Sequence, residues 1–151
     1  MKSHKPLKRK TPLRAKSGFK KRGKLKKVSK QKISVLQRKI WEHCKRITRA
    51  RYGNSCYTCP AKNLQGSDQQ TGHMWAKASL GAFLKYDLRI LRIQCAKCNR
   101  WNDGMGADFY ARMLSEIGEE KMKQLQKDRK KEVRAYEHYE KLLQEYQQIE
   151  K

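Results

Sequence analysis

The sequence CYTC at residues 56–59 and the sequence CAKC at residues 95–98 decide the fold of this chain of 151 residues. Each Cys-x-x-Cys turn brings two thiolates to one ion, and two such turns supply the four ligands of a tetrahedral Zn²⁺. Four thiolates leave no open coordination position, so we expect this zinc to stabilise the fold and to take no part in chemistry. The expected ligands are Cys56, Cys59, Cys95 and Cys98. An iron–sulfur cluster and a redox-active pair are the alternatives, although redox chemistry needs only one of the two pairs.

On the N-terminal side of these pairs, the chain is strongly basic. Of the 38 Lys+Arg and 14 Asp+Glu, residues 1–52 hold 21 basic side chains and a single acid, Glu42. The remaining 99 residues hold 17 basic and 13 acidic side chains, which excludes a uniformly basic globule. Residues 1–32 carry no acid, and proline and glycine interrupt them repeatedly. Proline breaks helices and a highly charged segment buries little apolar surface, so we expect a disordered basic arm over 1–32.

The basic arm is expected to contact phosphates of a nucleic acid. Such contacts release counterions and give strong, salt-dependent affinity without sequence preference. A solubilising tail, or nonspecific binding to ribosomal RNA or to a membrane surface, is the alternative, and the arm alone does not distinguish DNA from RNA. The expected contacts are Lys8, Arg9, Lys10, Arg14, Lys20, Lys21, Arg22, Lys26 and Lys27 from the arm, with Arg46 and Arg49 from the segment that follows.

The spacing of apolar residues predicts an α+β domain with flanking helices. Apolar residues recur every three or four positions over 33–53, which predicts an amphipathic basic helix with Cys44 buried on its apolar side. We assign 54–128 to the zinc-binding domain, with a β-prone run at 88–94 and helices that start at Asp108 and at 119. Gly118 is expected to end the first of these two helices. A C-terminal helix is expected over 129–151, and its aromatic side either packs on the domain or forms the seam of a homodimer.

His73 and Asn99 are the candidate catalytic residues within the zinc-binding domain. His73 follows the first cysteine pair, and Asn99 directly follows Cys98. We expect the zinc to draw the two segments together, so that the two side chains face each other across a small cleft. A neutral imidazole takes a proton from water, and an asparagine oxygen together with a carboxylate holds Mg²⁺ against a phosphate. The pattern therefore predicts hydrolysis of a phosphodiester by one metal ion.

The segment from Cys56 to Met122 resembles a known family. Its motifs CYTC, GHMWAKAS and KYDLRILRIQCAKCN are similar to those of the NinG (Rap) family of phage recombination proteins, regarded as endonucleases that act on branched DNA such as Holliday junctions. The order CxxC, His, CxxCN is also similar to the zinc-stapled HNH (ββα-metal) nucleases, including phage endonuclease VII. The resemblance implies an HNH-like core with a structural zinc on the four cysteines. It also implies His73 as general base and Asn99 as ligand of a catalytic Mg²⁺ or Mn²⁺.

Two positions depart from the HNH pattern. Gly72 stands where these nucleases usually have an aspartate that binds the catalytic metal, although the NinG pattern shares the glycine. Asp103, four residues beyond Asn99, is the first candidate for the missing carboxylate and Asp87 is the second. Ile90 stands where an asparagine usually orients the histidine. We expect Asn102 or a backbone carbonyl to orient His73 instead.

We interpret the sequence as a metal-dependent endonuclease that acts on branched DNA. A non-catalytic zinc-ribbon protein that binds DNA during recombination is the first alternative, and a ribosomal type of RNA-binding protein is the second. No apolar run approaches the roughly 20 residues of a membrane span. Met1 is followed directly by lysine with no apolar stretch typical of a secretory signal. We therefore expect no membrane partner and a cytoplasmic location, in the bacterial host if a phage encodes the chain.

Overall fold

The structure, a computed structural model, describes residues 30–150. The arm expected over 1–32 lies outside these residues except for its last three, which are helical. The helices are α1 (Lys30–Tyr52), α2 (Gly106–Ile117), α3 (Glu119–Asp128) and α4 (Ala135–Ile149), and the strands are β1 (Gln69–His73) and β2 (Leu91–Cys95). Helical turns lie at Gly66–Asp68, Lys77–Ser79, Leu88–Ile90, Lys97–Trp101 and Asp103–Met105. The expected α+β class is confirmed.

Helix α1 begins earlier than its apolar pattern indicates. Its first residues, Lys30 to Lys32, precede Ile33, the first apolar residue that packs against the core. Lysine and glutamine are good helix formers, so the helix continues past the last packed residue. The boundary expected at 33 is therefore three residues late, and Cys44 is fully buried on the inner face as expected.

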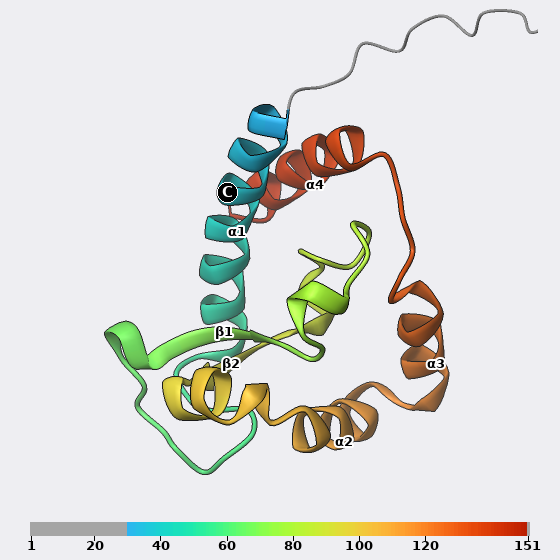
Figure 1. The fold of residues 1–151 in the computed structure, drawn as a ribbon. Helices are drawn as coiled ribbons and strands as arrows, with labels where there is room; N and C mark the ends of the chain where they lie inside the picture. Colours follow the sequence, from blue (N-terminus) through green and yellow to red (C-terminus); the bar gives the residue numbers. More distant parts are fainter. Residues whose placement is uncertain (1–29, 151) are drawn as a thin grey trace, which may run out of the picture.

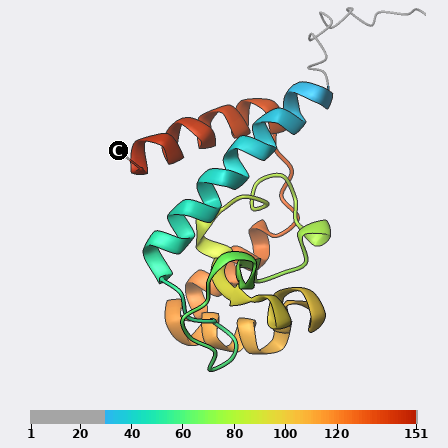
Figure 2. The same ribbon diagram turned by 90° about the vertical axis from the view of Figure 1, so that its left-hand side faces the viewer.

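Helices α1 and α4 cross each other on one side of the molecule (Figures 1 and 2). Tyr139 and Tyr146 of α4 are buried, and the Tyr146 hydroxyl donates to the Tyr86 carbonyl at 2.8 Å. The aromatic side of this helix thus packs within the chain, and a homodimer through it stays a prediction. The helix starts at Ala135 and not at 129, because Arg129 and Lys131 accept backbone hydrogen bonds from Gly81 and Phe83 in a non-helical connection.

Strands β1 and β2 pair antiparallel and lie against the lower part of α1 (Figure 1). The register places Gln70 opposite Gln94 and His73 opposite Leu91. Every residue of β2 is buried, so this strand is the centre of the small domain. The β-prone run from Leu88 is confirmed in part, since a helical turn at Leu88–Ile90 precedes the strand.

Helices α2 and α3 close the side of the sheet away from α4 (Figure 1). The expected stop at Gly118 is confirmed, and its φ of 83° is a conformation that side chains other than glycine rarely adopt. Phe109 and Met113 of α2, with Met122 and Leu125 of α3, fill the core beneath the strands. The two helices therefore supply much of the apolar packing beneath the sheet.

Candidate functional site

The four cysteines of the two Cys-x-x-Cys turns converge on one point, as expected from their spacing. Their sulfur atoms all lie within 4.8 Å of one another. The Cys59 and Cys95 sulfurs are 3.8 Å apart, which matches the edge of a tetrahedron with zinc–sulfur distances of about 2.3 Å. No other group of three or more His, Cys, Asp or Glu side chains close enough to share a metal ion occurs among residues 30–150. The donor set and its geometry fit a structural zinc ion.

Backbone N–H groups surround these sulfurs and favour their ionised form. The Cys95 N–H donates to Cys56 Sγ at 3.2 Å, and the Cys98 N–H donates to Cys95 Sγ at 3.4 Å. Burial opposes ionisation at Cys56, but hydrogen bonds from the Cys95 N–H, from Thr58 and from the Cys59 N–H outweigh it and lower the pKa of Cys56 to about 6. At Cys98 burial and the neighbouring thiols raise the pKa to about 12. Four thiolates therefore share this volume only around a cation.

A second feature is a pocket of about 740 Å³ between the end of β1 and the start of α2. His73, Lys77, Asn99 and Asp103 all line it. His73 is the last residue of β1, and Asn99 lies on the helical turn that follows the second cysteine pair. The structure thus brings together the two predicted catalytic residues and the first candidate for the missing carboxylate.

His73 is held in one orientation by its two neighbours. Its Nε2 donates to the Lys85 carbonyl at 3.0 Å, and its ring stacks on Trp41 with centroids 5.2 Å apart. Because a carbonyl oxygen only accepts, Nε2 carries the proton and Nδ1 presents a lone pair. Burial lowers the pKa of His73 to about 4, and the charges of Lys77 and Lys85 act in the same direction. The imidazole is therefore neutral at physiological pH.

Asn99 is fixed beside the residue that precedes His73. Its Nδ2 donates to Gln70 Oε1 at 2.8 Å. Its Oδ1 would lie 3.1 Å from a Cβ atom built on Gly72. Asp103 has a φ of 48°, in the left-handed region, and its carboxylate is exposed at the rim of the pocket. The pocket therefore combines a base, an amide oxygen and a carboxylate.

The other candidates for these roles lie elsewhere. Asp87 accepts from the Arg89 backbone N–H at 2.8 Å and pairs with the Arg89 guanidinium, outside the pocket. Ile90 is fully buried in the core, and its side chain makes no polar contact with His73. The Lys85 carbonyl takes the orienting role, which agrees with one of the two expectations, and the Asn102 side chain makes no hydrogen bond to the imidazole.

A family model described as Bacteriophage Lambda NinG protein matches residues 1–151. The chain belongs to the NinG family. It is therefore a member of a family associated with phage recombination. Searches of curated proteins and of solved structures found no match. Among residues 30–150 of this NinG-family chain, no helix combines the length and the apolar character that crossing a membrane requires.

The predicted DNA contacts of this NinG-family chain divide into two groups. All nine from Lys8 to Lys27 lie outside the described residues. On α1, Arg46 makes a bidentate ion pair with Glu150, with nitrogen–oxygen distances of 3.0 and 2.9 Å. Arg49 donates to the Gln69 carbonyl at 3.1 Å, so both α1 residues are engaged within the chain.

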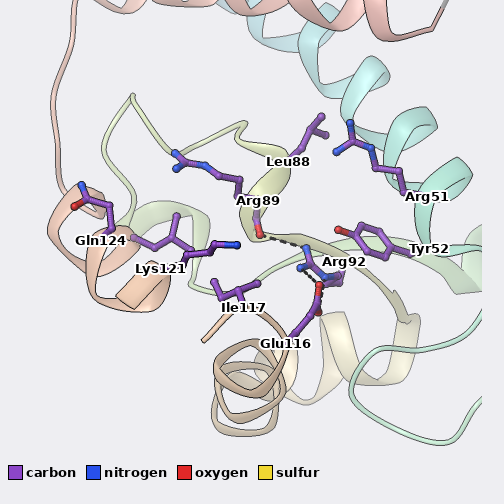
Figure 3. Close-up of a pocket in the computed structure, with 10 residues that line it drawn as sticks. Arg51, Tyr52, Leu88, Arg89, Arg92, Glu116, Ile117, Lys121 and Gln124 are labelled. Atoms are coloured by element: carbon purple, nitrogen blue, oxygen red, sulfur yellow. Dashed lines mark hydrogen bonds and ion pairs between the residues drawn. The ribbon is translucent and has the colours of Figure 1, made fainter. Parts of the chain in front are cut away.

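A cationic hollow of about 530 Å³ lies near the other end of α2 (Figure 3). Arg51 of α1 and Lys121 of α3 extend toward it from opposite sides (Figure 3). Neither has a carboxylate partner among residues 30–150. At its base Arg92 is buried, pairs with Glu116 and stacks on the Tyr52 ring at 4.4 Å. The hollow therefore presents unpaired positive charge next to an aromatic ring.

Several residues around the pocket were not predicted from the sequence. Trp41 and the Lys85 carbonyl position His73, and Lys77 lines the same pocket with its amine 4.8 Å from the Trp41 ring. None of these stands in a recognisable motif, and a backbone carbonyl has no signature in a sequence. Gln94 had a weak signal, since it is a polar residue in a strand that is buried throughout.

Proposed function

We propose that this NinG-family chain is a metal-dependent endonuclease that hydrolyses branched recombination DNA through an HNH-like core. This core consists of β1, β2 and the helical turn Lys97–Trp101. The observation that carries the proposal is the pocket in which His73, with a free Nδ1, lies beside Asn99 and Asp103. Phosphodiester hydrolysis needs a neutral base and oxygen ligands that can hold a metal ion, and this pocket contains both.

In this proposal each side chain of the pocket has one role. His73 Nδ1 accepts the proton of the attacking water, and the Lys85 carbonyl keeps the ring in the required tautomer. Asn99 Oδ1 and the Asp103 carboxylate would hold a Mg²⁺ or Mn²⁺ ion, which would neutralise charge on the phosphate and the leaving oxygen. Lys77 adds a positive charge to the same pocket.

The proposed DNA surface extends beyond the pocket. Helix α2 has 12 residues, about 18 Å, and separates the pocket at its start from the cationic hollow at its end. Arg51 and Lys121 in the hollow are suited to phosphate contacts at that distance from the cut. The basic arm adds contacts without sequence preference.

A cleavage assay on a synthetic four-way junction tests the proposal. We expect nicking with Mg²⁺ or Mn²⁺ and none with EDTA, with linear duplex cut more slowly. Binding without cleavage under every metal condition would favour the non-catalytic zinc-ribbon protein. Preferred binding of structured RNA over junction and duplex at one salt concentration would favour the ribosomal type of RNA-binding protein.

Removal of the arm is expected to weaken DNA binding whatever the sequence of the DNA. Deleting residues 1–29 leaves α1 complete, so zinc content and helical signal should be unchanged. Each lost phosphate contact flattens the slope of log affinity against log salt by about 0.9 on duplex DNA. Binding titrations at several salt concentrations measure this slope, and an unchanged slope would contradict the role of the arm.

Loss of either oxygen ligand is expected to raise the metal concentration that cleavage requires. Asn99→Ala removes the amide oxygen beside Gly72, and Asp103→Ala removes the carboxylate at the rim. Titration of Mg²⁺ in the junction assay should show a half-saturation point about tenfold higher or more for each variant. Asp87→Ala is the matched control, because its carboxylate pairs with Arg89 outside the pocket.

Cleavage is expected to persist at a pH where an ordinary histidine is protonated. The pKa of His73 is lowered to about 4, so the neutral base is lost only as the pH falls through that value. At pH 5.5 more than about nine-tenths of a base with this pKa is neutral, against about one-tenth for a pKa of 6.5. The junction-cleavage rate measured from pH 8 to 5 should show no acid limb centred near 6.5.

A further inference from the structure

Gln94 is a fully buried polar residue in the middle of the sheet. Its Nε2 donates to the Gly104 carbonyl at 2.8 Å and to Thr58 Oγ1 at 2.9 Å. Because the Gly104 carbonyl only accepts, the nitrogen must lie on that side of the amide. The Gln94 oxygen is therefore forced to face the opposite way, toward β1.

The Gln94 oxygen has no hydrogen-bond partner although it is buried. A Cβ atom built on Gly72 would lie only 1.9 Å from it, so this oxygen occupies the space next to position 72. A buried acceptor without a donor costs about 1–3 kcal/mol. Such an atom in a native fold calls for a ligand, an ion or a water.

A second amide oxygen converges on the same space. Gln70 Nε2 donates to the Ser67 carbonyl at 3.0 Å, which fixes Gln70 Oε1 on the side of Asn99. Asn99 must then present its nitrogen to Gln70, as the 2.8 Å bond shows, and its Oδ1 faces Gly72. The Gln94 oxygen and Asn99 Oδ1 thus face the same space next to Gly72. Hydrogen bonds that end on backbone carbonyls fix both orientations, and neither oxygen accepts a hydrogen bond.

We infer that the Gln94 side-chain oxygen is a ligand of the divalent cation, together with Asn99 Oδ1, and that Gly72 is small so that this oxygen can reach the site. This inference rests on the proposed function. Both oxygens lie within 3.1 Å of the Cβ position on Gly72, hence at most about 5 Å apart. Ligands at about 2.1 Å from a Mg²⁺ span up to about 4.2 Å. Amide oxygens are hard donors that suit Mg²⁺ and Mn²⁺.

Titration of Mn²⁺ into the zinc-loaded full chain, followed by the electron paramagnetic resonance signal of free Mn²⁺, tests the inference without cleavage. We expect one Mn²⁺ per chain in the wild type and at least tenfold weaker binding in Gln94→Ala. The double variant Gly72→Ala/Gln94→Ala should bind Mn²⁺ as weakly as Gln94→Ala does. Gly72→Asp/Gln94→Ala should regain affinity, because its carboxylate enters the space that Gln94 vacates. The two double variants differ only by that carboxylate.

A measurement on the wild type avoids any effect of substitution on folding. Addition of Mg²⁺ should shift the nuclear magnetic resonance signal of the Gln94 side-chain carbonyl carbon. The corresponding Gln70 signal should stay nearly unchanged, because the Gln70 oxygen already accepts a hydrogen bond from Asn99 Nδ2. Three results would each show that the Gln94 oxygen binds only water: wild-type Mn²⁺ affinity in Gln94→Ala, equal affinity of the two double variants, or an unshifted Gln94 signal. A wild type that binds no Mn²⁺ would instead overturn the proposed function.

Discussion

Cys95→Ser is expected to release the zinc ion and to unfold the region around both strands. Cys95 ends β2, and its sulfur accepts the Cys98 N–H. The apolar cluster on this side is small and is built mainly from the ligands themselves, with Leu64 and Ile93 as its other buried members. Zinc binding in such sites supplies about 10–16 kcal/mol that is shared with folding, comparable to or larger than the about 5–15 kcal/mol stability of a domain.

Metal analysis and hydrogen exchange measure this loss. The wild type should carry one zinc per chain, and the variant none, with exchange protection lost over residues 54–105. Cys44→Ala is the matched control, because Cys44 lies in the α1 core and its thiol donates to the Tyr86 carbonyl at 3.3 Å. It should keep its zinc at a cost of about 1–2 kcal/mol. A Cys95→Ser protein that retains zinc and native protection would disprove the four-cysteine site.

Local patterns in the sequence account for most of the described fold. The cysteine spacing predicts the converging sulfurs, and the three- and four-residue apolar spacing predicts α1 and the helices on both sides of Gly118. Helix ends set by tertiary contacts were missed, because the non-helical connection before Ala135 depends on backbone bonds to Gly81 and Phe83, about 50 residues away along the chain.

The candidate site shows the same division between local and tertiary information. His73 and Asn99 stand in motifs beside the cysteine pairs and could be singled out. The role of Lys85 depends on its backbone carbonyl, and that of Gln94 depends on which way one amide is turned. Arg46 illustrates the converse, since a basic side chain expected on DNA pairs with Glu150, a residue 104 positions away. Such partners are set by packing, which residue spacing does not encode.

His73→Ala is expected to abolish junction cleavage and to leave junction binding near the wild-type level. A general base contributes about 10²- to 10⁴-fold to the rate, and it acts in the transition state more than in the ground state. Its removal should therefore lower kcat and kcat/KM by the same factor. The loss of stacking on Trp41 should cost about 1 kcal/mol of stability, so zinc content and fold should persist.

His138→Ala is the matched control for this change. Like His73, His138 is partly buried, is hydrogen-bonded to a backbone carbonyl, that of Phe83 at 3.2 Å, and stacks on an aromatic ring. It lies on α4 and does not line the pocket with Asn99. A purely structural role for such histidines would make the two variants lose activity alike, in step with their stability. Loss of cleavage in His73→Ala alone, at equal zinc content and equal junction affinity, would assign the general-base role to His73. Cleavage retained in His73→Ala would exclude His73 as the general base.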